Sequence, residues 1–86
     1  MVQLMSPAAW LRRRRERRDA QVLAVLADGP LWGLEVARRA GMPSGTAHPT
    51  LARLEGAGLV ESGWGYPRRR IYWLTDTGRQ AAVRAL

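Results

Sequence analysis

The side chains with the clearest chemistry in this 86-residue chain are its arginines, which supply all fourteen basic residues. Seven acidic residues leave a formal net charge of +7, and most arginines fall in three groups, at 12–18, 38–39 and 68–70. A guanidinium group can bind a phosphate or the edge of a guanine through two hydrogen bonds at once. This excess of arginine therefore predicts a polyanionic partner, either nucleic acid or a membrane surface.

Other kinds of site are disfavoured by the residue types that the sequence lacks. There is no cysteine and a single histidine, His48, so we expect no disulfide, metal site, cofactor or catalytic set. The longest apolar run, residues 22–27, is far shorter than the ~20 residues of a membrane span and too short for the core of an export signal. We therefore expect a protein that is not an enzyme, has no membrane contact, and stays in a bacterial cytoplasm in association with the nucleoid.

The first group of arginines is predicted to lie on a long helix. Ser6 can cap its start and Pro7 suits its first turn, and the helix is expected to run to Asp28, before a Gly-Pro pair. Its second half, AQVLAVLA, is continuously apolar and is predicted to be buried, whereas its first half carries six arginines in seven residues. Residues 31–33 then favour a short extended segment.

Two shorter helices separated by a tight turn follow, and they form a candidate helix-turn-helix. The first is expected over residues 34–40, with Gly41 as its C-terminal cap. The second is expected to open at Ser44 or Gly45 and to end at 56–58. In a helix-turn-helix the second helix is the one that enters the major groove of DNA.

The second helix of the pair is predicted to present an exposed face of small residues and one arginine: Gly45, Thr46, Pro49, Ala52 and Arg53. Small side chains would let the helix lie deep in a major groove, where Thr46 and Arg53 could reach base edges. Pro49 is tolerated inside a helix only in the first turn, so we place the helix start at Gly45 or Thr46.

A β-hairpin is predicted behind the helix pair, with strands at 59–62 and Arg69–Leu74 and a turn-rich loop of about five residues between them. The three arginines at 68–70 stand at its tip, and strand alternation leads us to expect that two of them reach the same phosphate backbone. Thr75 or Asp76 is expected to cap a short final helix.

The whole chain, residues 1–86, is therefore predicted to be one winged helix-turn-helix domain, mainly α-helical with a small β-hairpin. Its parts are a basic N-terminal helix (1–28), the helix-turn-helix (34–58), the wing (59–74) and a short C-terminal helix (75–86). Trp32 and Trp73 are expected in the core, and Trp10 and Trp64 are expected to be partly exposed.

Three stretches of the chain resemble the DNA-binding domain of PadR-like transcriptional regulators. They are GPLWGLEVARRAG (29–41), PSGTAHPTLARLEGAGLVES (43–62) and PRRRIYWLTDTGR (67–79). The family pattern has a Gly-Pro-Leu-x-Gly segment, a recognition segment with Leu-x-Arg-Leu-Glu, and a wing rich in proline and arginine before Tyr-x-Leu-Thr. The resemblance covers about fifty of the 86 residues. It implies a winged helix that binds duplex DNA and controls transcription, usually by repression, as a dimer.

The chain departs from the family pattern at two positions near the expected DNA surface. Ala47 and His48 stand where the family usually has Leu-Tyr. Because that tyrosine contacts phosphate in the family, the resemblance implies the same role for His48. Leu34 stands where the family usually has another tyrosine.

A third departure from the family pattern concerns the segment that forms the dimer. PadR-like proteins continue past the wing into a long dimerisation helix, whereas this chain has eleven residues after Thr75, so we expect the usual dimer interface and ligand pocket to be truncated. We therefore expect no small-molecule effector. A homodimer is expected on the N-terminal helix, around Trp10 and Leu11. The C-terminal segment around Val83 and Leu86 is expected to contribute.

The candidate DNA-contacting residues come from three of these parts: Ser44, Gly45, Thr46, His48, Pro49, Arg53, Arg68, Arg69, Arg70, Arg38, Arg14 and Arg15. They favour a sequence-specific regulator of transcription that acts on double-stranded DNA as a repressor. Two alternatives remain open at this point: a small architectural or accessory DNA-binding protein of a phage or plasmid, and a protein–protein adaptor on a winged-helix scaffold. The groups at 12–18 and 38–39 also have a simpler interpretation, as solvated helix surface.

Overall fold

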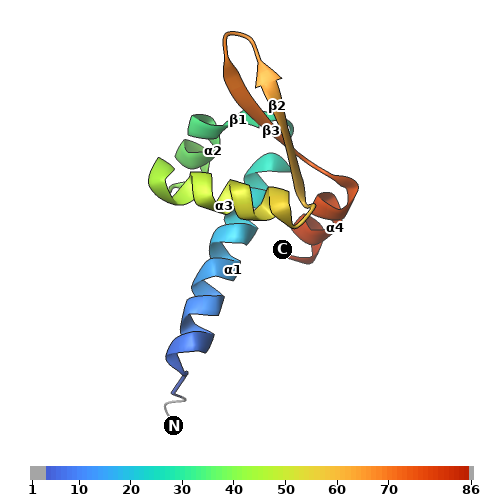
Figure 1. Ribbon diagram of the computed structural model, residues 1–86. Helices are drawn as coiled ribbons and strands as arrows, with labels where there is room; N and C mark the ends of the chain where they lie inside the picture. Colours follow the sequence, from blue (N-terminus) through green and yellow to red (C-terminus); the bar gives the residue numbers. More distant parts are fainter. Residues whose placement is uncertain (1–3, 86) are drawn as a thin grey trace.

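The computed structural model describes residues 4–85 and shows four helices and a small antiparallel sheet (Figure 1). The elements in chain order are α1 (Pro7–Leu26), β1 (Leu31–Trp32), α2 (Gly33–Ala40), α3 (Ser44–Gly56), β2 (Val60–Gly65), β3 (Arg69–Leu74) and α4 (Asp76–Arg84). The strands lie in the order β1-β3-β2. This confirms the predicted class, a mainly helical winged helix-turn-helix with a β-hairpin wing.

Helix α1 is packed at one end and projecting at the other. The hydroxyl of Ser6 caps it by accepting a hydrogen bond from the amide of Ala9 at 3.2 Å, as the sequence predicts. The helix ends at Leu26, two residues before the predicted end at Asp28. Its C-terminal half carries the three buried residues of the helix, and its N-terminal half extends away from the body of the domain (Figure 1). Leu11, in that projecting half, is 58% exposed.

The core lies where α1, α2 and α3 meet the inner face of the sheet. Its largest fully buried side chains are Val22, Val36, Leu51 and Val60, one from each of these elements. Burying an aliphatic side chain of this size stabilises the fold by about 1.5–3 kcal/mol. The core therefore fixes α3 by one face and leaves its opposite face to solvent.

The start of α3 agrees with one predicted position, Ser44, but not with the prediction that Pro49 lies in the first turn. The helix begins at Ser44, so Pro49 is its sixth residue and lies in the second turn, not the first. At that position proline removes the amide that would bond to the carbonyl of Gly45. Gly45 is exposed, and a side chain there would meet open space. Water can therefore reach its carbonyl, which makes the missing bond tolerable.

The first strand of the wing is longer than predicted, because β2 runs from Val60 to Gly65 and not over 59–62. It pairs with β3 in an unbroken register from Val60↔Leu74 to Gly65↔Arg69, so the turn contains three residues, 66–68, and not about five. The glycines that suggested a loop have a packing role instead. A Cβ at Gly65 would lie 2.8 Å from Cγ1 of Ile71, and one at Gly63 would lie 3.2 Å from the ring of Trp73. Glycine is therefore favoured here because side chains from β3 cover these positions.

The predicted cap of α4 is confirmed at Thr75. Its hydroxyl accepts a hydrogen bond from the amide of Gly78 at 2.9 Å and donates to the carbonyl of Gly58 at 2.7 Å. The amide of Thr75 also donates to the carbonyl of Leu59, and the buried Gly78 lies directly against that carbonyl. These contacts join the first turn of α4 to the segment between α3 and the wing.

Among residues 4–85, no helix combines the length and the apolar character that a bilayer crossing requires. Helix α1 has 20 residues, but six of them are arginines.

Candidate nucleic-acid interface

The structure gathers four of the predicted DNA-contacting residues around one surface pocket of about 340 Å³. His48 comes from α3, and Arg68, Arg69 and Arg70 come from the wing. Trp32, Gly33, Leu34 and Tyr72 complete the lining. Side chains that are separated by about twenty residues in sequence therefore form one basic hollow between the wing and the start of α3.

His48 is oriented by its own helix. Its Nδ1 lies 2.9 Å from the carbonyl oxygen of Ser44, which can only accept, so Nδ1 carries the hydrogen. The other nitrogen, Nε2, lies beside Gly33, where a Cβ would be 3.0 Å from it. The ring thus packs against the first residue of α2, and Nε2 is left to accept a hydrogen bond.

Arg69 lies over the ring of Trp32, with its guanidinium carbon 4.0 Å from the ring centroid. Trp32 was expected in the core, but it is half-buried and serves as a platform for this cation–π contact. The contact is possible because β1 pairs with β3, which sets Trp32 opposite Ile71. Arg69 is therefore held in a defined place at the rim of the pocket.

Arg70 is directed to the other face of the hairpin, as strand alternation predicts. Its Nε donates to the hydroxyl of Ser62 at 3.0 Å, and that hydroxyl donates to Glu55 at 2.5 Å. Its Nη2 is 3.9 Å from the same carboxylate, and its guanidinium lies 5.5 Å from the ring centroid of Trp64. The wing is thereby tied to the last turns of α3.

The sequence predicts that Arg53 is free on the exposed face of α3, but in the structure it is paired with an acidic residue of α1. Its Nη1 donates to Oδ1 of Asp19 at 2.7 Å, and the two side chains are 36% and 26% exposed. Burial raises the pKa of Asp19, and the Arg53 guanidinium opposes that rise. The ion pair joins α1 to α3. On the same face Gly45, Pro49 and Ala52 are exposed, as expected.

Arg38 is engaged within α2. Its Nε donates to Glu35 at 3.0 Å, and Arg39, one turn further along the helix, donates to the same carboxylate at 2.9 Å. Hydrogen bonds from Arg38 and Arg39 lower the pKa of Glu35 to about 2. Glu35 is therefore ionised at neutral pH and offsets part of the positive charge at this end of α2.

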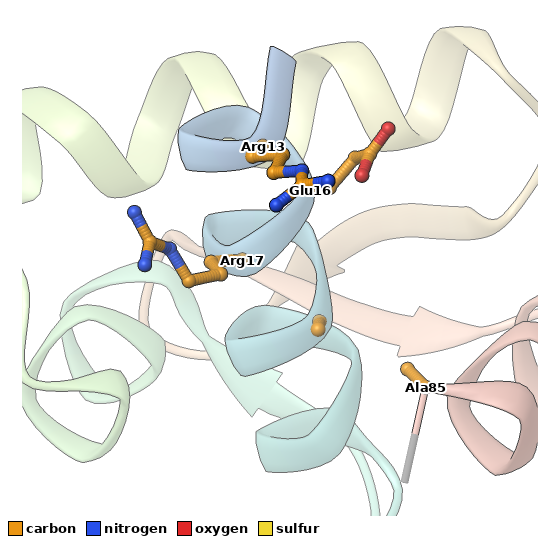
Figure 2. A pocket seen from close by; sticks show the side chains of 5 residues that line it. Arg13, Glu16, Arg17 and Ala85 are labelled. Atoms are coloured by element: carbon orange, nitrogen blue, oxygen red, sulfur yellow. The ribbon is translucent and has the colours of Figure 1, made fainter. Parts of the chain in front are cut away.

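The arginines of α1 lie apart from the wing pocket, because the projecting half of α1 and the wing extend in opposite directions (Figure 1). Arg14 lies over the ring of Trp10 at 4.9 Å from its centroid, and Arg15 is exposed. A second pocket, of about 390 Å³, separates α1 from the end of α4. Figure 2 shows Glu16 and Arg17 pointing to different sides of α1, with the Arg17 guanidinium directed away from Ala85.

With this geometry described, comparison with known proteins identifies the family. The family model for the transcriptional regulator PadR-like family matches residues 22–84. The chain belongs to the PadR-like family. The match includes α2, α3, the wing and the whole of α4 together with the buried end of α1, and it leaves out the projecting half of α1. No curated protein matches this PadR-like chain.

Solved structures show the same fold as this PadR-like domain. A MarR-family transcriptional regulator from Silicibacter pomeroyi is 24% identical, with a TM-score of 0.76, and the match covers 80% of this chain and 48% of the regulator. BldR from Sulfolobus solfataricus is also 24% identical, with a TM-score of 0.73 and coverage of 79% and 50%. ZitR from Lactococcus lactis, as an apo mutant, is 16% identical, with a TM-score of 0.74 and coverage of 87% and 58%. The chain thus spans about half the length of these regulators.

Sequence reasoning missed the side chains that hold the arginines of this PadR-like domain in place. Asp19, Trp32 and Glu55 each contact an arginine on another element. The Asp19–Arg53 pair is 34 residues apart in sequence, so no helical or strand periodicity connects its members. A partial signal was available for Asp19, because it is an acidic residue directly after six arginines and before the buried part of α1.

Proposed function

We propose that this PadR-like domain binds duplex DNA sequence-specifically and represses transcription. The observation that carries the proposal is one pocket whose lining includes His48 of α3 and wing residues 68–70, with the guanidinium of Arg70 turned to the other face of the hairpin. A phosphate in this pocket would adjoin both the exposed face of α3 and the wing. Guanidinium groups that are already held by Trp32 and Ser62 lose less side-chain entropy on binding than free ones.

In this proposal α3 is the helix that enters the major groove. Gly45, Pro49 and Ala52 are small and exposed, so the helix backbone can approach the bases closely. Ser44, which is exposed, and Thr46, which is half-buried, would contact bases or phosphates from the start of the helix. Arg38, Arg14 and Arg15 would add phosphate contacts at the edges of the complex, because long cationic side chains need not touch base edges to strengthen binding.

The test is a mobility-shift titration of the protein with a random duplex and with a duplex selected from a random pool, each at several salt concentrations. We expect log K to fall linearly with log salt for both duplexes, and binding to the selected duplex to be at least about a thousandfold tighter. Equal affinities for the two duplexes, with cooperative binding along the DNA, would indicate an architectural protein. If the protein retarded neither duplex, it would be a protein–protein adaptor. In vitro transcription from a template whose promoter overlaps the selected site should then fall.

The Arg53–Asp19 pair makes a separate prediction about how α3 is positioned. We expect R53A and D19N to weaken binding to selected and random duplexes equally, because either change frees α3 from α1. The double variant should be no weaker than either single variant, with a coupling energy of about 1 kcal/mol. Urea unfolding and mobility shifts on all four proteins measure this. If R53A alone lost affinity for the selected duplex while D19N kept it, Arg53 would be a base contact, as the sequence predicts.

We also propose a homodimer that uses the projecting half of α1. Leu4, Trp10 and Leu11 are 91%, 47% and 58% exposed, and Val83 on α4 is 68% exposed. Leu86, the other residue predicted for this interface, lies outside the described residues. Paired winged helices read two half-sites, which adds specificity that one half-site lacks.

Sedimentation velocity tests the dimer. We expect a dimer at tens of micromolar for the unchanged chain and a monomer for W10A/L11A, because the exposed apolar surface of α1 would be lost. Leu34→Ala is the matched control, since Leu34 is 51% exposed but lies on α2. A W10A/L11A protein that stays fully dimeric would place the interface elsewhere.

A further inference from the structure

The arginine segment of α1, residues 12–18, carries charge that the fold does not neutralise. Residues 11–17 are all exposed, so the helix is open to solvent on every side here. In the part of the chain that the structure describes, no ion pair includes an arginine of this segment, whereas Arg38, Arg53 and Arg79 each bind a carboxylate. Like charges three or four residues apart on a helix repel one another and destabilise it. The fold of the domain therefore gives no reason for the segment.

The ion pair that joins Asp19 to α3 shows which side of this helix faces α3. At about 100° per residue, Arg12 and Arg15 lie within about 40° of Asp19 around the helix axis. By the same spacing, Arg13 and Arg17 lie about 120° and 160° from Asp19. These two arginines line the pocket beside the end of α4. A duplex on the exposed face of α3 therefore lies on the other side of α1 from Arg13 and Arg17.

The composition of the arginine segment indicates what binds its free side. Residues 12–18 read RRRRERR and include no apolar side chain. The centre of a protein interface is depleted of charged residues, and a helix on a membrane surface needs an apolar face. A nucleic-acid backbone needs neither, because cations bind its phosphates without apolar contact. A helix that is open all round and about 10–12 Å across also fits a major groove about 12 Å wide.

We propose that Arg13 and Arg17 bind a second DNA duplex, so that one domain bridges two duplexes. The proposal rests on the DNA binding proposed above, in which α3 and the wing hold the first duplex. The wing and the projecting half of α1 extend in opposite directions (Figure 1), which leaves room for a duplex at each end. Once the first duplex is bound, another stretch of the same DNA is held at a high effective concentration near α1. Such a bridge would bring distant parts of one DNA molecule together.

Capture of a second duplex tests the bridge. The selected duplex is fixed to beads, saturated with protein and then offered a labelled random duplex. We expect the unchanged protein to retain the labelled duplex, and R13A/R17A to retain about tenfold less of it. In solution, R13A/R17A should still shift the selected duplex with nearly unchanged affinity. The matched control is R12A/R15A, which removes the same number of charges from the other side of the helix and should retain most of the labelled duplex. All four arginines are exposed, so both variants should melt like the unchanged protein.

Several outcomes would overturn the bridge. Equal losses of capture in R13A/R17A and R12A/R15A would mean that charge, and not its position on the helix, determines capture. Loss of capture in W10A/L11A would place the bridge at the proposed dimer contact. Displacement of the labelled duplex by single-stranded RNA, but not by unlabelled duplex, would identify RNA as the ligand. A protein that binds the selected duplex and captures nothing has no second site. Failure of the DNA-binding proposal is distinct, because then the unchanged protein would bind neither duplex.

Discussion

Replacing Gly78 with alanine is expected to lower the free energy of unfolding by about 3 kcal/mol. The methyl group would overlap the backbone carbonyl of Leu59, which is fixed by its hydrogen bond from the amide of Thr75. A backbone carbonyl cannot turn aside as a flexible side chain can, so either α4 or the segment before the wing must shift. For a domain of this size the melting temperature should fall by roughly 12–24 °C.

Thermal unfolding followed by circular dichroism measures the effect of G78A, with Gly56→Ala as the matched control. Gly56 is also helical, and a side chain there would meet open space. Alanine has the higher helix propensity, so G56A should be neutral or stabilising by up to about 1 kcal/mol. An unchanged melting temperature in G78A would show that the junction between α4 and the wing can move without loss.

The second large effect is expected at the wing. Replacing Arg68, Arg69 and Arg70 with alanine should weaken binding to selected and random duplexes about equally, by roughly 10–100-fold near physiological salt. The slope of log K against log salt should fall by about one to two, because each lost phosphate contact contributes about 0.9. Mobility shifts across a salt series measure both quantities.

The control for the wing variant is R12A/R13A/R17A, which removes the same number of charges from the arginine-rich segment 12–18 of α1. If binding depends on the wing pocket, this variant should lose less affinity and less slope than the wing variant. Equal losses in the two variants would mean that net charge alone drives binding, and an unchanged slope in the wing variant would remove the wing from the interface.

The parts of the fold that sequence could predict are those with local causes. The caps at Ser6 and Thr75 and the left-handed Gly41 that ends α2 each follow from a few neighbouring residues. Strand Arg69–Leu74 was predicted with its observed bounds, because its β-branched and aromatic residues act within one strand. The recognition of the family likewise rested on contiguous motifs.

The parts that escaped prediction have causes that are distant in sequence. Strand β2 was cut short because Gly63 and Gly65 look like turn residues until the side chains of Ile71 and Trp73 are seen beside them. Arg53 was placed on the exposed face because its partner Asp19 lies on another helix. For the candidate site, sequence named the arginines and His48, but only the fold shows which of them share a pocket.

The uninterrupted course of α1 has a mechanical consequence. At about 1.5 Å per residue its 20 residues form a rod of about 30 Å, with its root in the core and its free end well outside it. The Asp19–Arg53 ion pair joins α1 to α3 close to the end of α1 that packs in the core. A tilt of the free end therefore turns α3 through the same angle. In a dimer joined through these rods, their length and tilt would set the distance between the two α3 helices, and so the spacing and phase of the half-sites along the double helix.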